Sequence, residues 1–125
     1  MRVLLVDRSE ETRDMFAALF LNLGYEVRTV ATATEALAWV PLYRPHAVFT
    51  GIFLPDQSGF DLCASLRKMP DTASALIVAI TGHMGPDAAR LAAEAGFDHY
   101  LVKPVNLDAL LATLQAPPAQ RPTSA

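Results

Sequence analysis

Three polar residues stand where short apolar runs of the sequence end. Asp7, Thr81 and Lys103 each follow or close such a run. An acid, a hydroxyl and an amine brought together from distant parts of a chain form a polar cluster suited to binding or transferring a charged group. Alternatively, Asp7 caps the turn that follows it and forms an ion pair with Lys103, which requires no ligand. The residue types alone leave both interpretations open.

The apolar runs have the pattern of parallel strands that are covered on both faces. Apolar residues recur at helical spacing between the runs, as at positions 16–23 and 107–114. The β-α alternation repeats five times, which predicts a doubly wound α/β fold: one parallel sheet with right-handed crossovers and helices on both faces. Ligands of such sheets bind beyond the carboxyl ends of the strands, where the polar residues fall. The predicted strands are Val3–Val6, Val27–Val30, Ala47–Phe49, Leu76–Ile80 and Tyr100–Val102.

Capping and breaking residues mark the helix boundaries. Ser9 is a suitable N-cap for the first helix, and Gly24 is suited to its C-terminal end. Thr32 and Glu35 form a capping-box pattern that opens the second helix, which Pro41 is expected to end or kink. The remaining signals are Gly59 before a third helix that runs to about Lys68, Pro86 in the first turn of the fourth, and Gly96 at its end.

Composition limits the classes of function. The chain of 125 residues fits a single domain, is 52% hydrophobic and carries a net charge of −3. Because it has no run of Lys or Arg, direct nucleic-acid binding is not expected. Its single cysteine excludes an internal disulfide, and no apolar run is long enough to cross a membrane, so we expect a cytoplasmic protein. The domain is expected to span residues 1–114, with a proline-rich tail or linker at 115–125.

A series of short motifs occurs in a defined order along the chain. They are Val3-Leu4-Leu5-Val6-Asp7, Leu23-Gly24-Tyr25, Glu35-Ala36-Leu37, Leu54-Pro55 with Gly59, Thr81, Ala95-Gly96 and Tyr100-Leu101-Val102-Lys103-Pro104-Val105. Each motif is weak alone, but together, over roughly residues 2 to 114, the chain resembles the receiver domains of bacterial two-component response regulators. The resemblance implies a flavodoxin-like, five-stranded sheet of order 2-1-3-4-5 and a cis peptide bond between Lys103 and Pro104.

The resemblance also assigns roles to the polar residues. In such domains an aspartate after the third strand attacks a phosphoryl donor and becomes an aspartyl phosphate, while Mg²⁺ neutralises the transferring group. Lys103 would contact the phosphoryl oxygens, and the Thr81 hydroxyl would turn toward them, followed by the switch aromatic Tyr100. Two positions depart from this pattern: the acceptor position holds Gly51, and the second acid of the usual pair is Arg8.

Gly51 and Arg8 remove both the acceptor and the metal ligands. Glycine has no nucleophile, and of the groups that would touch Mg²⁺ directly only the backbone carbonyl of Phe53 remains, which holds the ion weakly. The pocket changes from net negative in the family pattern to +1, since Asp7 faces Arg8 and Lys103. We therefore expect no metal, no cofactor and no catalytic residue, and a pocket closed by Asp7 pairing with Lys103, Arg8 or both.

Several alternatives stay open at these positions. The Arg8 guanidinium either lies in the vacated metal position, hydrogen-bonded to Asp7, or turns toward solvent. Asp56 is an alternative acceptor, although an acid in a turn before a helix is more often a turn-former or a cap. His83, in the loop after Thr81, is either an anion contact or a surface histidine.

The sequence favours a binding module for signalling over an enzyme. We expect it to act independently of phosphorylation on a histidine kinase, a phosphotransfer protein, an output domain or a second copy of itself. The alternatives are a receiver that uses Asp56 as surrogate acceptor and a module that binds a small anion through Arg8 and Lys103. The exposed side of the first helix around Leu21 and the alanine-rich fourth helix are candidate docking surfaces.

Overall fold

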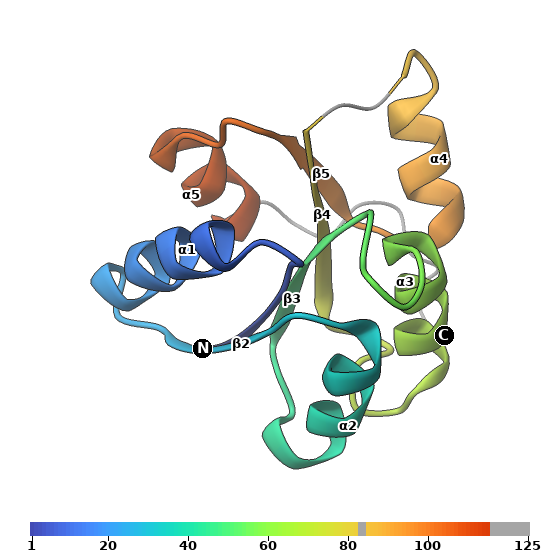
Figure 1. The fold of residues 1–125 in the computed structure, drawn as a ribbon, viewed down its shortest axis with the longest axis horizontal. Helices are drawn as coiled ribbons and strands as arrows, with labels where there is room; N and C mark the ends of the chain where they lie inside the picture. The colour runs from blue at the N-terminus through green and yellow to red at the C-terminus, as the bar shows by residue number, and fades with distance from the viewer. Residues whose placement is uncertain (83–84, 116–125) are drawn as a thin grey trace.

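Five parallel strands form a single central sheet (Figure 1). The computed structural model describes residues 1–82 and 85–115. The strand order is β2-β1-β3-β4-β5, which confirms the predicted doubly wound, flavodoxin-like topology. Every predicted strand is present and is longer by one or two residues. The strands are β1 (Arg2–Val6), β2 (Glu26–Val30), β3 (Ala47–Gly51), β4 (Leu76–Thr81) and β5 (His99–Val102).

Helices cover both faces of the sheet, with α1 and α5 on one face and α2, α3 and α4 on the other (Figure 1). Successive strand residues point to opposite faces, so each strand serves two cores. Leu5 belongs to the core that includes Phe16 and Leu110, whereas its neighbour Leu4 belongs to the core that includes Leu66. The helices are α1 (Glu10–Asn22), α2 (Ala33–Tyr43), α3 (Gly59–Lys68), α4 (Ala88–Ala95) and α5 (Leu107–Gln115).

Hydroxyl groups cap the first three helices, and two of these caps were predicted. The Ser9 hydroxyl accepts a hydrogen bond from the backbone N–H of Thr12, and the Thr32 hydroxyl accepts one from that of Glu35. Ser58 caps α3 in the same way. Each cap satisfies a helical N–H that has no partner within its own helix. The predicted C-terminal glycines Gly24 and Gly96 have positive φ, which glycine adopts without strain.

Two helix boundaries differ from the prediction. Helix α2 continues through Pro41 to Tyr43 and ends at Arg44, whose φ is 50°. Because Pro41 lies in the last turn, its missing N–H removes a single hydrogen bond near the end of the helix. Helix α4 begins after the N-cap Asp87, so Pro86 lies before the helix rather than in its first turn.

The apolar stripe of α5 is only partly buried. Leu110 is fully buried, but Leu107, the first residue of the helix, is 45% exposed. Thr113 is buried instead, and its hydroxyl donates to the carbonyl oxygen of Ala109 at 3.0 Å, which satisfies this polar group in the core. Within residues 1–82 and 85–115, no helix has the length and apolarity needed to cross a membrane.

A buried ion pair fixes the amino-terminal ends of β4 and β5. The Arg67 Nη2 atom lies 2.9 Å from Asp98 Oδ2, and the side chain of Asp98 is completely buried. The backbone N–H of Ile77 donates to the same carboxylate oxygen at 2.9 Å. The Arg67 guanidinium also donates to the carbonyl oxygens of Gly96 and Ala75. These bonds join α3, the start of β4 and the turn before β5. They lie at the amino-terminal ends of the strands, whereas the polar residues gather at the carboxyl ends.

Candidate functional site

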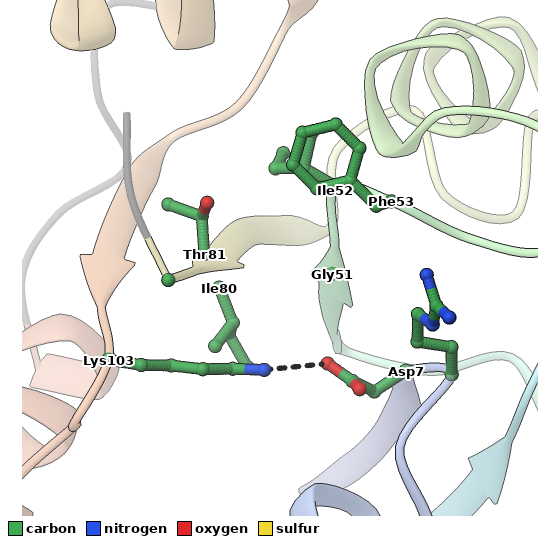
Figure 2. A pocket seen from close by; sticks show the side chains of 9 residues that line it. Asp7, Gly51, Ile52, Phe53, Ile80, Thr81 and Lys103 are labelled. Carbon is green, nitrogen blue, oxygen red and sulfur yellow. Dashed lines mark hydrogen bonds and ion pairs between the residues drawn. The ribbon is translucent and has the colours of Figure 1, made fainter. Parts of the chain in front are cut away.

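The carboxyl ends of four strands meet around an open pocket, which we call the strand-end pocket (Figure 2). Asp7 and Arg8 directly follow β1, and Gly51 is the last residue of β3. Thr81 is the last residue of β4, and Lys103 directly follows β5. The structure therefore brings together all five residues predicted for this site. The pocket is lined by Asp7, Arg8, Gly51, Ile52, Phe53, Ile80, Thr81, Gly82 and Lys103.

The Asp7 carboxylate is buried and held at both of its oxygens. The backbone N–H of Ser9 donates to Asp7 Oδ1 at 2.8 Å, and Lys103 Nζ lies 3.5 Å from Asp7 Oδ2. Figure 2 shows the two side chains reaching toward each other across the pocket. Only 4% of the Asp7 side chain is exposed, against 34% for Lys103. The predicted Asp7–Lys103 pair is thus present, and it leaves the ammonium group in contact with solvent.

Gly51 has no side chain, and both the Asp7 carboxylate and the start of helix α3 lie close to its backbone. A Cβ built on Gly51 would lie 2.9 Å from Asp7 Oδ2, so any side chain there would displace the carboxylate. The Thr50 hydroxyl donates a hydrogen bond to the Gly51 carbonyl oxygen at 2.9 Å. A Cβ on Gly59 would collide with that same carbonyl oxygen, and the Gly59 N–H donates to the Ile52 carbonyl at 2.6 Å. Helix α3 can therefore start against the end of β3 because its first residue is glycine.

Arg8 lines the pocket but is exposed. Among the ion pairs and hydrogen bonds of the described residues, Asp7 pairs with Lys103 and none joins it to Arg8. The expectation of an Arg8 guanidinium hydrogen-bonded to Asp7 in the vacated metal position is therefore wrong in this structure, and the solvent-facing alternative holds. The partners of Asp7 in this structure are the Ser9 N–H on one oxygen and the Lys103 ammonium on the other.

Thr81 and Tyr100 occupy different surroundings. Thr81 is only 3% exposed and lines the strand-end pocket, and its backbone carbonyl accepts a hydrogen bond from the Lys103 N–H at 2.8 Å. Tyr100 is 36% exposed and lines a separate groove between α4 and α5, together with Ala92 and Thr113. The structure thus places Tyr100 outside the strand-end pocket, and its role as a switch remains a prediction. The peptide bond between Lys103 and Pro104 is cis, as the resemblance implied.

The donor set of the pocket does not suit a divalent cation. Mg²⁺ is bound in proteins through carboxylates together with waters or substrate phosphates. Among the described residues that line the pocket, Asp7 is the only one with a carboxylate, and Lys103 is already its partner. Asp7 carries one negative charge and Arg8 and Lys103 carry one positive charge each, so the formal charge of the lining is +1. Such a lining repels a divalent cation and attracts an anion.

Asp56, the alternative acceptor, is hydrogen-bonded to the first residues of helix α2. Its carboxylate accepts hydrogen bonds from the Thr34 hydroxyl at 2.6 Å and from the backbone N–H groups of Thr34 and Ala33 at 2.8 and 3.0 Å. The hydrogen bond from the Thr34 hydroxyl is the largest cause that lowers the pKa of Asp56 to about 2. Asp56 is also absent from the lining of the strand-end pocket. It acts as a helix cap contributed by a distant loop.

The sequence interpretation named Phe53 at this site for its backbone carbonyl alone and did not name the apolar side chains of the lining. Ile52, Phe53 and Ile80 adjoin Gly51 and Thr81 in sequence, and this adjacency was the available signal. The Phe53 side chain is 72% exposed. His83 and residues 116–125, which include nearly all of the predicted tail, lie outside the described residues.

The chain matches a known family model over nearly all of the described residues. The model that matches residues 3–115 is the response regulator receiver domain. The matched stretch includes every residue of the strand-end pocket.

Several characterised and uncharacterised proteins have similar sequences. A 14.6 kDa uncharacterised protein of Leptolyngbya boryana is 28% identical over 106 residues, which cover 85% of this chain and 81% of that protein. The response regulator MprA of Mycobacterium avium is 31% identical over 116 residues, covering 93% of this chain and 50% of MprA. The transcriptional regulatory protein TcrA of Mycobacterium tuberculosis is 34% identical over 115 residues, covering 92% and 45%. The chain thus spans about half the length of MprA and TcrA.

Solved structures share the fold closely. The chemotaxis response regulator CheY4 of Vibrio cholerae superimposes with a TM-score of 0.84 at 32% identity, covering 91% of this chain and 95% of that one. A putative response regulator from Chloroflexus aurantiacus gives a TM-score of 0.85 at 30% identity, covering 90% and 93%. Sequence and backbone therefore agree on one family.

Proposed function

This chain belongs to the response regulator receiver domain family, and from that premise we propose that it is a signalling module that acts by protein–protein contact and is not switched by phosphorylation. Receiver domains are signalling modules of two-component systems rather than enzymes in the usual sense. The observation that carries the proposal is position 51: the residue has no side chain, and Asp7 Oδ2 lies 2.9 Å from where a Cβ would be.

Three features of the pocket support the proposal. No carboxylate stands at position 51 to attack phosphorus. The positive lining, with Arg8 in place of an acid, disfavours the metal ion that phosphoryl transfer to a carboxylate requires. The Asp7–Lys103 pair supplies the lysine with a counter-charge in the absence of an acceptor aspartate. The first feature concerns the nucleophile, the second the metal ion and the third the lysine that would contact the phosphoryl oxygens.

The surrogate acceptor is the weaker candidate. Three hydrogen bonds hold the Asp56 carboxylate against the first turn of α2. To act as nucleophile at the strand-end pocket, Asp56 would have to give up all three bonds, and its loop would have to refold. We therefore assign Asp56 a structural role.

The partners follow from the family as proposals. A histidine kinase, a phosphotransfer protein or an output domain would dock on this module, and a second copy could do so as well. The exposed side chain of Leu21 on α1, which is 60% exposed as predicted, offers an apolar contact for such a partner. The alanine-rich surface of α4 offers close approach to another helix.

The experiment is to incubate the protein with phosphoramidate and Mg²⁺ and to weigh the intact chain. We expect no stoichiometric phosphoryl adduct, because no carboxylate is available in a metal-binding pocket. The Asp56→Asn variant, treated in parallel, should give the same mass record as the unmodified protein. A stoichiometric adduct that maps to Asp56 would replace this proposal with the surrogate-acceptor function.

A further inference from the structure

We propose that the open edge of strand β2 pairs with the same edge of a second copy of this chain. The two strands would run antiparallel about a two-fold axis and join two five-stranded sheets into one. The inference goes beyond the proposed function, in which a second copy is one of several partners, and it does not depend on the chemistry of position 51. The contact surface is the outer side of β2 from Glu26 to Val30, which we call the β2 edge.

The backbone of the β2 edge has hydrogen-bonding groups that face outward. Strand β2 is the first in the order β2-β1-β3-β4-β5, so within the described residues it has a neighbouring strand on one side only. The backbone N–H of Glu26 donates to the Met1 carbonyl oxygen on the β1 side. Residues that bond to the neighbouring strand alternate with residues that do not, so the N–H and C=O groups of Val27 and Thr29 point away from β1. A row of such groups is a template for another strand.

Two opposite charges lie on the β2 edge. Glu26 and Arg28 are two residues apart, so both side chains are on the same face of the sheet, and Arg28 stacks there on Trp39 of α2 with its guanidinium carbon 4.6 Å from the ring centroid. Both residues are exposed, and among the described residues neither Glu26 nor Arg28 takes part in an ion pair. The edge therefore offers one acid and one base, side by side, to a partner strand.

These charges select one register for the pairing. With Val27 opposite Val27 of the second copy, Glu26 lies directly opposite Arg28, and the two-fold axis forms this pair twice. The two Val27 residues would exchange backbone hydrogen bonds, and the charged pairs would fall at the adjacent positions, where cross-strand side chains approach most closely. Arg28 opposite Arg28 would set like charges against each other, which destabilises a pairing. Thr29 opposite Thr29 would leave both charges without a partner.

The test is sedimentation equilibrium of the unmodified chain over a wide range of protein concentrations. We expect a reversible monomer–dimer equilibrium, and a weak one, because a single strand edge buries little area. Glu26→Arg and Arg28→Glu each turn two attractive pairs into two repulsive ones, so each should raise the Kd of the dimer about tenfold or more. The matched control Lys68→Glu, which reverses an exposed charge at the end of α3, should leave the Kd unchanged.

A mixture of the two variants separates charge pairing from a loss of folding. The Glu26→Arg chain carries two bases on its edge and the Arg28→Glu chain carries two acids, so every cross-strand pair of a mixed dimer again joins an acid and a base. We expect the equimolar mixture to dimerise at concentrations where each variant alone is monomeric. A chain that carries both changes should dimerise like the unmodified chain, because its charges have only exchanged places.

Amide hydrogen exchange locates the contact on the backbone. The Val27 N–H points away from β1, so it should exchange rapidly in the dilute monomer and slowly in the dimer. Four results would each overturn the inference: a chain that stays monomeric throughout, a Kd unaffected by either charge reversal, a mixture that is not rescued, or a dimer whose Val27 N–H is unprotected. All four leave the proposed function standing. A phosphoryl adduct after phosphoramidate treatment would overturn the proposed function and leave the edge pairing untouched.

Discussion

Gly51 has no side chain, and neighbouring residues lie close to the place where one would be. Asp7 Oδ2 reaches to 2.9 Å of the place where a Cβ would be, and from there it pairs with Lys103. The Thr50 hydroxyl donates a hydrogen bond to the Gly51 carbonyl oxygen, which holds the backbone at this position. A side chain at position 51 would therefore have to move the Asp7 carboxylate, and we propose that a change at position 51 alone does not make the pocket competent for phosphoryl transfer.

Gly59 gives a sharp prediction at this scale. A Gly59→Ala change would drive a Cβ into the Gly51 carbonyl oxygen and to 2.9 Å of the Ile52 Cα atom, both of them backbone. Because backbone cannot rotate away, we expect a loss of about 1–3 kcal/mol in the free energy of unfolding. Urea denaturation measures this loss. Gly85→Ala is the matched control, since a Cβ there would meet nothing within 4 Å, and it should change stability by less than about 0.5 kcal/mol.

The start of helix α2 is built by two separate parts of the chain. Thr32 caps it locally, and Asp56 adds three hydrogen bonds from the loop between β3 and α3. A carboxylate at a helix N-terminus is also favoured by the helix dipole. The acid that sequence reasoning treated as a possible acceptor thus serves to tie one helix to the loop beside the pocket.

This cap predicts a pH dependence with a definite sign. The pKa of Asp56 falls from its ordinary value of 3.8 to about 2 in the folded protein. A depressed carboxyl pKa stabilises the fold above the unfolded value and loses that contribution as the pH falls through the folded value. Comparing urea unfolding of the parent and Asp56→Asn, we expect the parent's advantage to be full above about pH 4 and to fade toward pH 2.

The control for this comparison is Asp14→Asn, which changes an exposed carboxylate within α1. It should not reproduce the acid-dependent difference seen for Asp56→Asn. If the difference between the parent and Asp56→Asn stays constant from pH 5 to pH 2, or grows as the pH falls, Asp56 does not cap α2 as a charged group.

Local patterns predicted the elements well because their causes are local. The strands follow from unbroken apolar runs, and the caps at Ser9 and Thr32 act within three residues of the helix start. The contacts that sequence could not supply are long-range. Asp56 reaches Thr34 across 22 positions, and Gly59 meets the Gly51 carbonyl only because α3 folds back onto the end of β3.

Across the whole molecule, the order of the strands explains why the candidate site could be predicted at all. The carboxyl ends of parallel strands all lie on the same side of the sheet. Once the fold is assigned, the side chains of Asp7, Thr81 and Lys103 are therefore expected to lie close together. The direction of the Arg8 side chain could not be predicted in this way. An exposed side chain has several staggered rotamers of similar energy, and neither the fold nor the residue type selects one of them.

The overall architecture also bears on the proposed loss of the acceptor. The sheet, the Asp7–Lys103 pair, Thr81 and Tyr100 are all retained in a domain that matches the receiver family from residue 3 to residue 115. The chain spans about half the length of MprA and TcrA, so a whole protein's activity and partners are proposals for this module. What we propose to be lost is confined to positions 8 and 51.

The most direct measurement of that claim is the intact mass of four proteins after treatment with phosphoramidate and Mg²⁺. They are the parent chain, Arg8→Asp, Gly51→Asp and the double variant that carries both changes. If acceptor and metal site are both absent and the rest of the pocket is competent, only the double variant should gain one phosphoryl group, and that group should map to position 51. A stoichiometric adduct on the parent chain, or an equal yield on Gly51→Asp alone, would contradict the account.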